Sequence, residues 1–189
     1  MIQAQHNGAI STILLSRPPV NAIDPVFVTA FHAALDEVEK ASPTAIVIRS
    51  DQKCFCAGAD LALIRGFFEQ KGGTQAMVDY VTSLHKLFNR IEALKAVTIA
   101  CINGPALGGG LELALSCDLR IATYGSKIGL PEARVGMIPG AGGTQRLTRL
   151  CGPGVSARLI LGGEVVDGKE AERLGVVQWS VDGAQFDET

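Results

Sequence analysis

Residues 108–118 read GGGLELALSCD, so one glutamate, Glu112, follows three consecutive glycines within an otherwise apolar stretch. Each glycine costs roughly 1 kcal/mol relative to alanine in a helix, and burial disfavours the charged form of a carboxyl group. A helix N-terminus has unpaired N–H groups, and glycines let a ligand atom approach them because they lack a Cβ atom. The stretch therefore suits an oxyanion site beside a carboxylate base. On spacing alone, close helix packing with Glu112 capping another group explains it equally well.

A second glycine turn favours the oxyanion interpretation. The sequence FCAGAD, residues 55–60, follows a β-rich run that ends at Ser50, and it precedes a predicted helix. Backbone donors from two such turns can converge on one carbonyl oxygen. A second carboxylate, Glu132, follows a short predicted strand and precedes the glycine-rich turn 138–144. Two carboxyl groups in different protonation states are suited to moving protons beside a developing negative charge.

Several other readings of the glycine motifs fail on the residues they lack. No stretch completes the Gly-x4-Gly-Lys-Ser/Thr sequence of a phosphate-binding loop. The dinucleotide pattern Gly-x-Gly-x-x-Gly fails after Gly108 and after Gly140, where leucine and glutamine stand at its last position. No Gly-x-Ser-x-Gly sequence marks a serine hydrolase. The motifs thus do not favour a kinase, a dehydrogenase or an esterase.

Composition restricts the class of protein further. With 189 residues, 47% of them hydrophobic, and 22 glycines, the chain is typical of one compact, turn-rich α/β domain. A net charge of −2 gives no basic surface for nucleic acid. The five cysteines form no metal or redox spacing, so we expect free thiols and no metal. The start MIQAQHNGAI lacks signal-peptide features, and the apolar segment 97–117 is interrupted by Asn-Gly-Pro and Glu112. We expect a cytoplasmic protein with no membrane contact.

Strands and helices are predicted to alternate along the chain. Asp24 is the expected N-cap, and Pro25 the first residue, of the first helix. A mobile loop is expected at 67–73. β-Rich runs predict strands at 9–15, 44–50, 97–102, 119–122 and 127–130, and helical spacing predicts helices at 25–40, 59–65, 74–94, 108–116, 143–150, 155–161 and 168–174. This alternation indicates βαβ units and a largely parallel sheet.

Three motifs in one order carry a family resemblance. FCAGAD, NGPALGGGLELALSCDLRIA and GLPEARVGMIPGAGGTQRL resemble the enoyl-CoA hydratase/isomerase (crotonase) family, and the match runs to about residue 177. The resemblance implies an α/β fold, the crotonase-like (ClpP/crotonase) spiral of ββα units. It implies one crotonase-like core domain over 1–177. Residues 178–189 are then expected to be a polar, frayed C-terminal tail.

The resemblance also implies an acyl-CoA site. The thioester carbonyl would be held by an oxyanion hole made of the backbone N–H groups of Ala59 and Gly109. Glu112 and Glu132 match the two catalytic glutamates of the family. We interpret Glu112 as the base beside the oxyanion hole and Glu132 as the acid that delivers a proton to C2, with the alternative that the two share both protons through one water.

Further backbone positions follow from the same resemblance. Gly140 matches a donor that helps to hold the water, and the backbone around Ala57 and Ala59 would meet the adenine of coenzyme A. Coenzyme A is part of the substrate, so no separate cofactor is expected. Family members usually continue for several more helices, which cover the acyl site and contribute to trimer contacts. For this shorter chain we expect a homotrimer or hexamer with weakened acyl-CoA affinity.

Three functions fit these observations. Two glutamates favour an enoyl-CoA hydratase, a lyase that adds water across the double bond of a 2-enoyl-CoA to give 3-hydroxyacyl-CoA in fatty-acid β-oxidation or related metabolism. A Δ3,Δ2-enoyl-CoA isomerase chiefly needs one glutamate to move a proton. A truncated, catalytically silent assembly module is the third possibility, because the usual cover of the acyl site is missing.

Overall fold

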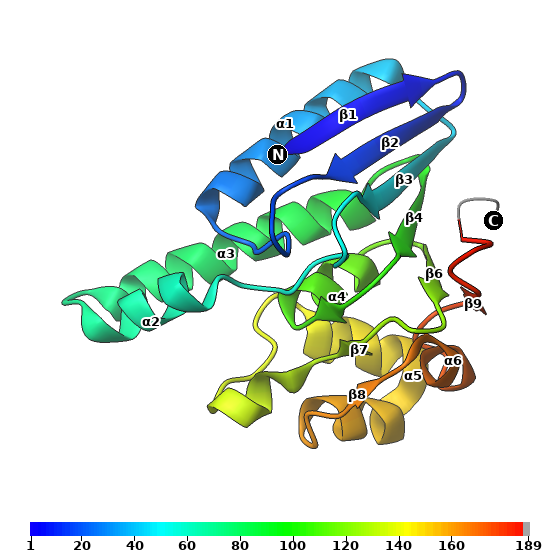
Figure 1. Cartoon of the computed structure of the whole chain (residues 1–189). Coiled ribbons are helices and arrows are strands. Elements are labelled where there is room, and N and C mark those ends of the chain that lie inside the picture. The colour runs from blue at the N-terminus through cyan, green and yellow to red at the C-terminus, as the bar shows by residue number, and fades with distance from the viewer. Residues whose placement is uncertain (187–189) are drawn as a thin grey trace.

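The computed structural model describes residues 1–186 and contains two sheets (Figure 1). The larger sheet has six strands in the order β1-β2-β3-β4-β6-β9, and all neighbours are parallel except β1 and β2. Its strands are β1 (Ile2–Asn7), β2 (Ile10–Leu15), β3 (Ala45–Ser50), β4 (Val97–Ile102), β6 (Leu119–Thr123) and β9 (Trp179–Val181). The predicted α/β class and parallel sheet are therefore confirmed.

A smaller sheet and seven helical segments complete the described chain. The small sheet joins β5 (Ala106–Leu107), β7 (Ile128–Gly129) and β8 (Val165–Val166). The helices are α1 (Pro25–Ala41), α2 (Leu61–Glu69), α3 (Gly73–Glu92), α4 (Gly109–Leu115), α5 (Gly143–Ile160), α6 (Gly168–Arg173) and the 3₁₀-helix η1 (Pro131–Val135). Helix α1 packs on β1, β2 and α3, while α4 and η1 pack on α5. Figure 1 shows the α2–α3 pair extending to one side of the molecule.

Helix α1 forms for the reasons that its sequence predicts. Asp24 accepts a hydrogen bond from the N–H of Phe27 at 2.8 Å and so caps the helix, and Pro25 is its first residue. The residues expected at helical spacing on its apolar face are all buried, namely Val28, Phe31, Ala34, Leu35 and Val38. Burial of this face against the sheet provides most of the stability of such a helix.

The apolar face of helix α3 packs in the hydrophobic core at its C-terminal end and lines a cavity at its N-terminal end. Towards its C-terminal end, Leu87, Phe88 and Ile91 belong to the hydrophobic core. Towards its N-terminal end, Met77 and Val81 are only half-buried and line a cavity. The helical spacing predicted in the sequence thus describes a helix that is part core and part wall of a cavity.

The region after α2 corrects one prediction. We expected a helix at 59–65 and a mobile loop at 67–73, but α2 begins at Leu61 and continues to Glu69. Asp60 is its N-cap, since its side chain accepts from the N–H groups of Ala62 and Leu63. The ring of Phe67 packs on Tyr80 of α3 with centroids 5.8 Å apart, which explains why the helix continues.

The C-terminal region corrects a second prediction. Part of the predicted polar tail, 178–189, is strand β9, which lies parallel to β6 in the large sheet. Gln178 precedes this strand, and its side-chain oxygen accepts from the backbone N–H of Arg120 at 2.8 Å. The last three positions of the predicted tail lie outside the described residues. Strands β1, β5 and β8 were also not predicted, because they are short or lack strong alternation.

The two helices predicted at 143–150 and 155–161 form one element, α5, that is interrupted at Gly152. The backbone of Gly152 has φ +78° and ψ 169°, and Pro153 follows it. A residue before proline is disfavoured in the helical region, so the interruption is local in origin.

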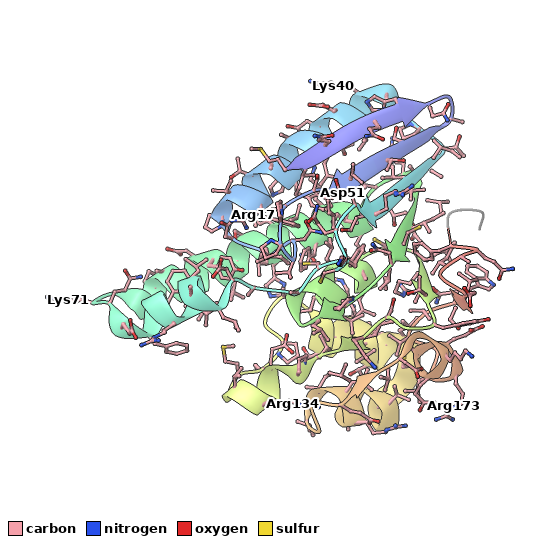
Figure 2. The ribbon with its side chains drawn as sticks, in the orientation of Figure 1. Arg17, Lys40, Asp51, Lys71, Arg134 and Arg173 are labelled. Carbon is pink, nitrogen blue, oxygen red and sulfur yellow. The ribbon has the colours of Figure 1, made fainter. Side chains whose placement is uncertain are left out.

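Charged side chains such as Lys40, Lys71 and Arg173 lie at the surface (Figure 2). Among residues 1–186, no helix has the length and apolar character needed to cross a bilayer.

Candidate active site

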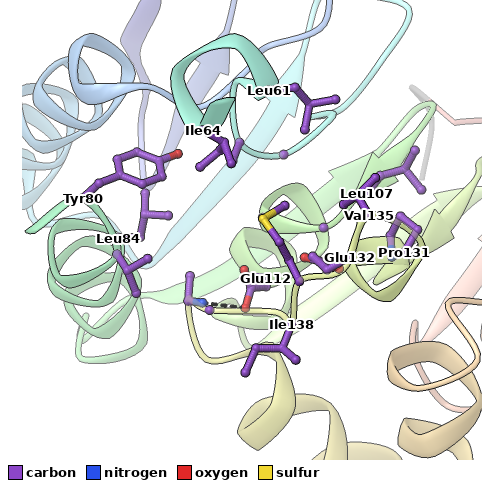
Figure 3. A pocket seen from close by; sticks show the side chains of 18 of the residues that line it. Leu61, Ile64, Tyr80, Leu84, Leu107, Glu112, Pro131, Glu132, Val135 and Ile138 are labelled. Atoms are coloured by element: carbon purple, nitrogen blue, oxygen red, sulfur yellow. Dashed lines mark hydrogen bonds between the residues drawn. The ribbon is translucent and has the colours of Figure 1, made fainter. Parts of the chain in front are cut away.

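A cavity of about 310 Å³ lies between α2, α3, α4 and η1. Its walls are mainly apolar and include Ile64, Leu84 and Val135 (Figure 3). Glu112 and Glu132 are the only carboxyl side chains among its lining residues in the described chain. Both predicted glycine turns, at 57–59 and 107–109, also line it. The tertiary structure therefore brings together the two turns and the two carboxyl groups predicted from the sequence.

The three glycines before Glu112 each face a different group at close range. A Cβ atom on Gly108, whose φ is +53°, would lie 2.9 Å from Oε1 of Glu132. One on Gly109 would lie 3.5 Å from the amide nitrogen of Ala59. One on Gly110 would lie 2.0 Å from the carbonyl oxygen of Cys56. Close packing, one of the two explanations left open above, is therefore observed at Gly108 and Gly110.

The amides of Ala59 and Gly109 are neighbours at the cavity. Gly109 is the first residue of α4, so its N–H lies outside the hydrogen-bond ladder of that helix. The N–H of Ala59 has no backbone acceptor among the described residues. Gly58, in the middle of the first turn, has φ +91°, and a Cβ there would lie 2.6 Å from the carbonyl oxygen of Leu107. This contact between backbones leaves two donors beside each other at the cavity wall.

Glu112 is buried, with 2% of its surface exposed. Its Oε1 accepts a hydrogen bond from the N–H of Ala141 at 2.8 Å, drawn as a dashed line in Figure 3, and one from the N–H of Gly143 at 2.7 Å. Burial raises its pKa to about 7, the amide of Gly143 opposes that rise, and the nearby charge of Glu132 adds to it. Glu112 therefore changes protonation state near neutral pH, as a general base requires.

Glu132 has a different environment on η1. Its Oε2 is buried and has no hydrogen-bond partner. Burial is the main cause that raises its pKa above the usual value of a glutamate. An unpaired buried carboxylate oxygen disfavours the charged form, whereas Glu112 receives two amide donors that favour it. Burial thus raises the pKa of both carboxyl groups, while their hydrogen-bond surroundings differ.

The other predicted site residues lie at the same cavity. Ala57 lines it next to the Gly58 turn, and Gly140 lines it next to the loop that binds Glu112. The amides that hold Glu112 belong to Ala141 and Gly143, which the sequence analysis did not single out. The sequence feature that could have indicated these two donors is the glycine-rich turn 138–144, because glycines allow backbone N–H groups to approach a side chain such as that of Glu112.

Tyr80 supports the first glycine turn from α3. Its hydroxyl donates to the carbonyl oxygen of Ile23 at 2.8 Å. Ile23 in turn donates its N–H to the carbonyl oxygen of Gly58 at 2.8 Å, and its carbonyl oxygen also accepts from the N–H of Asp60 at 3.0 Å. Tyr80 therefore holds the strand-like segment that fixes both sides of Ala59. Sequence reasoning placed Tyr80 on a helix but gave no reason to connect it with this turn.

Comparisons with known proteins show which proteins this chain is similar to. A protein of Arabidopsis thaliana named probable enoyl-CoA hydratase 2, mitochondrial, is 42% identical over 185 residues, which are 96% of this chain and 60% of that protein. The short-chain-enoyl-CoA hydratase of Clostridium acetobutylicum is 34% identical over 96% of this chain and 69% of its own length. The chain thus spans about 60% of the length of the first of these curated relatives.

A solved structure confirms the predicted crotonase-like fold. The enoyl-CoA hydratase of Bacillus anthracis superposes with a TM-score of 0.91 at 33% identity, covering 99% of this chain and 72% of that one. Residues 5–189 match the sequence profile of the family described as enoyl-CoA hydratase/isomerase. Because that match covers nearly the whole chain, this protein belongs to the enoyl-CoA hydratase/isomerase family.

Proposed function

We propose that this chain carries an enoyl-CoA hydratase site, which adds water across the double bond of a 2-enoyl-CoA thioester. One observation carries the proposal. Glu112, held by two amides through one oxygen, and Glu132, with one buried oxygen unpaired, line the same apolar cavity as two neighbouring free amides. The printed names of the relatives support the same reaction class.

The two free amides would stabilise the charge that develops in the reaction. Attack of water at C3 of an unsaturated thioester moves negative charge onto the carbonyl oxygen, which gives an enolate. Ala59 and Gly109 lie side by side at the cavity, and among the described residues their N–H groups have no backbone acceptor to compete with that oxygen. Losing one such preorganised donor typically costs about 3 kcal/mol of transition-state stabilisation.

The two glutamates would carry the protons. Ionised Glu112 accepts a proton from the water as its oxygen bonds to C3, and protonated Glu132 delivers its proton to C2. The product is the 3-hydroxyacyl thioester, and transfer of the proton from Glu112 to Glu132 restores the starting state. We assign the roles in this way because two amide donors favour the charged form of Glu112 and Oε2 of Glu132 is buried without a donor, although burial raises the pKa of both groups.

The walls of the cavity suit the acyl part of such a substrate. Leu61, Ile64, Met77 and Leu84 line one side, and none of them offers a charged group. The position of Ala57 beside Ala59 is where the family resemblance would place the adenine of coenzyme A. Gly140, at the rim next to the loop that holds Glu112, is the matching candidate for a donor to the water.

Turnover of crotonyl-CoA by the purified 189-residue protein tests the proposal. Loss of the enoyl-thioester absorbance, with 3-hydroxybutyryl-CoA identified as the product, is the expected result. A parallel assay with a 3-enoyl-CoA measures double-bond isomerisation. Binding of a non-reactive acyl-CoA is measured by calorimetry on the same preparation.

The outcomes separate the three functions. Hydration supports the proposal, and isomerisation without hydration replaces it with the isomerase. Acyl-CoA binding with neither reaction identifies a catalytically silent binding module. If the protein shows no turnover and no acyl-CoA binding, the proposal of an acyl-CoA site in this chain is wrong.

A further inference from the structure

Arg146 of α5 holds the loop that binds Glu112, although it does not line the cavity. Its Nη1 donates to the carbonyl oxygen of Ala141 at 3.0 Å. The N–H of Ala141 and the N–H of Gly143 are the two donors to Oε1 of Glu112. The turn 141–143 therefore accepts a hydrogen bond from the guanidinium group through the carbonyl of Ala141, and it donates two hydrogen bonds to Glu112 through its N–H groups.

The residue between those two donors shows how closely the guanidinium packs. Gly142 has φ +102°, which favours glycine, and a Cβ atom there would lie 2.3 Å from Nη1 of Arg146. The turn thus has no side chain at the point where the guanidinium lies against it. Any side chain at Gly142 would displace Arg146 as well as strain the backbone.

Helix α3 fixes the other edge of the guanidinium. Nη2 of Arg146 donates to the side-chain oxygen of Asn89 at 2.7 Å and to Oε2 of Glu92 at 2.9 Å. The arginine side chain is 8% exposed, whereas that of Glu92 is 53% exposed. A buried, forked arginine with acceptors on both edges has little freedom to move, so it transmits the position of α3 to the 141–143 turn.

We propose that Arg146 is a positioning residue for the proton acceptor. By holding the carbonyl oxygen of Ala141, it keeps both amides on Oε1 of Glu112 and leaves Oε2 of Glu112 to react. This inference rests on the proposed function for its kinetic consequences, but the hold on Glu112 is a property of the chain itself. Tyr80 plays the corresponding structural role for the other glycine turn, through Ile23.

The titratable and charged groups around Glu112 and Arg146 determine whether the pKa of Glu112 rises or falls in the variants. Glu112 is faced by Glu132 from η1, Tyr80 from α3 and Arg146 from α5. Arg146 is faced by Glu92 and His85 from α3 and by Arg149 from its own helix. The positive charge of Arg146 lowers the pKa of Glu112, against the rise caused by burial. Removing that charge, or loosening the two amides, raises the pKa of Glu112 further. Both effects move the acidic limb of the pH–rate profile to higher pH.

The test compares Arg146 with a second arginine that joins helices away from the cavity. Arg90 of α3 donates to Asp36 and Glu39 of α1. The variants Arg146→Met and Arg90→Met keep the apolar stem and remove the charge and the donors, while Arg146→Lys keeps the charge alone. Thermal unfolding by circular dichroism shows which variants are folded.

Two readouts follow, and only one needs turnover. The first is the pH profile of kcat/KM for crotonyl-CoA, with kcat and KM measured separately. The second is the titration midpoint of the Glu112 carboxyl by ¹³C NMR of glutamate-labelled protein, assigned by its loss in Glu112→Gln. For Arg146→Met we expect both to move up by about 0.5–1 pH unit, kcat at pH 7 to fall roughly two- to fivefold as the ionised fraction of Glu112 falls, and KM to stay nearly constant. Arg146→Lys should fall between, and Arg90→Met should match the parent.

The outcomes are distinct. If Arg146→Met titrates like Arg90→Met and the parent, Arg146 only ties two helices together and the inference is wrong. If Arg146→Met does not fold, the same comparison is made with Arg146→Lys, where an unchanged midpoint and an unchanged kcat overturn it. If the parent has no hydratase activity but the midpoint moves in Arg146→Met, the proposed function fails and the role of Arg146 stands.

Discussion

At the scale of single residues, the two glutamates differ by what surrounds their oxygens. Glu112 receives two amide donors on Oε1, and Glu132 keeps a buried, unpaired Oε2. Burial raises the pKa of both, to about 7 for Glu112. Hydrogen-bond donors favour the charged form of a carboxyl group and oppose the effect of burial at Glu112, whereas Oε2 of Glu132 has no donor to do so.

Replacing either glutamate by glutamine tests these roles. Glutamine keeps the shape and cannot accept or deliver the proton, so Glu112→Gln and Glu132→Gln should each lower hydration of crotonyl-CoA by about 10²-fold or more. The exposed Glu37 of α1 supplies the control, since Glu37→Gln should leave kcat unchanged. Rates of hydration and isomerisation are measured for each variant. A Glu112→Gln protein that hydrates as fast as the parent would show that Glu112 is structural.

At the scale of elements, the glycine turns position α4 against the segment before α2. Gly110 lies so close to the carbonyl of Cys56, and Gly58 so close to that of Leu107, that neither has room for a side chain. Cys56 also accepts from the N–H of Leu107 at 3.1 Å through its backbone. The donors of Ala59 and Gly109 are adjacent because these two backbones touch.

Gly110→Ala should disturb that contact severely. The new Cβ would lie 2.0 Å from a backbone oxygen, so the two segments must separate, and we expect a loss of about 3 kcal/mol or more in the free energy of unfolding. Gly66, in helix α2, has no atom within 4 Å of the corresponding position. Gly66→Ala should be neutral or stabilise by up to about 1 kcal/mol through helix propensity. Denaturant unfolding of both variants measures the difference, and equal stabilities would contradict the close approach.

At the scale of the whole molecule, the C-terminal residues complete the large sheet. Strand β9 pairs with β6, and Gln178 accepts from both the backbone and the Nη2 of Arg120. Arg120 is buried and also donates to the carbonyl of Cys117, two residues after the last residue of α4. The end of the described chain is thereby connected to the helix that carries Glu112.

Two truncations measure this connection. Removing residues 178–189 deletes β9 and Gln178, whereas removing 183–189 keeps both. The first should be less stable than the second by about 2 kcal/mol or more, because it leaves donors of the buried Arg120 without an acceptor. Thermal and denaturant unfolding give the comparison. Two truncated proteins of equal stability would mean that β9 adds nothing to the sheet, as the predicted frayed tail implied.

The sequence by itself determined the local elements and the identity of the chemical groups. Asp24 and Pro25 start α1, Gly152 and Pro153 interrupt α5, and the three motifs contain both glutamates and both glycine turns. Caps, glycine and proline restrictions and helical spacing act over a few residues, so they can be read from the order of residues. The predicted crotonase-like fold followed from those motifs in register.

Only the tertiary structure decided which groups act on one another. The amide of Ala141 reaches Glu112 across 29 residues of sequence, and Arg146 reaches Asn89 across 57. Strand β9 was mistaken for a tail because three residues show no periodicity, and they form a strand through pairing with β6. Contacts of this kind depend on packing between distant segments, which no local pattern encodes, and they supply the hydrogen bonds that Glu112 accepts.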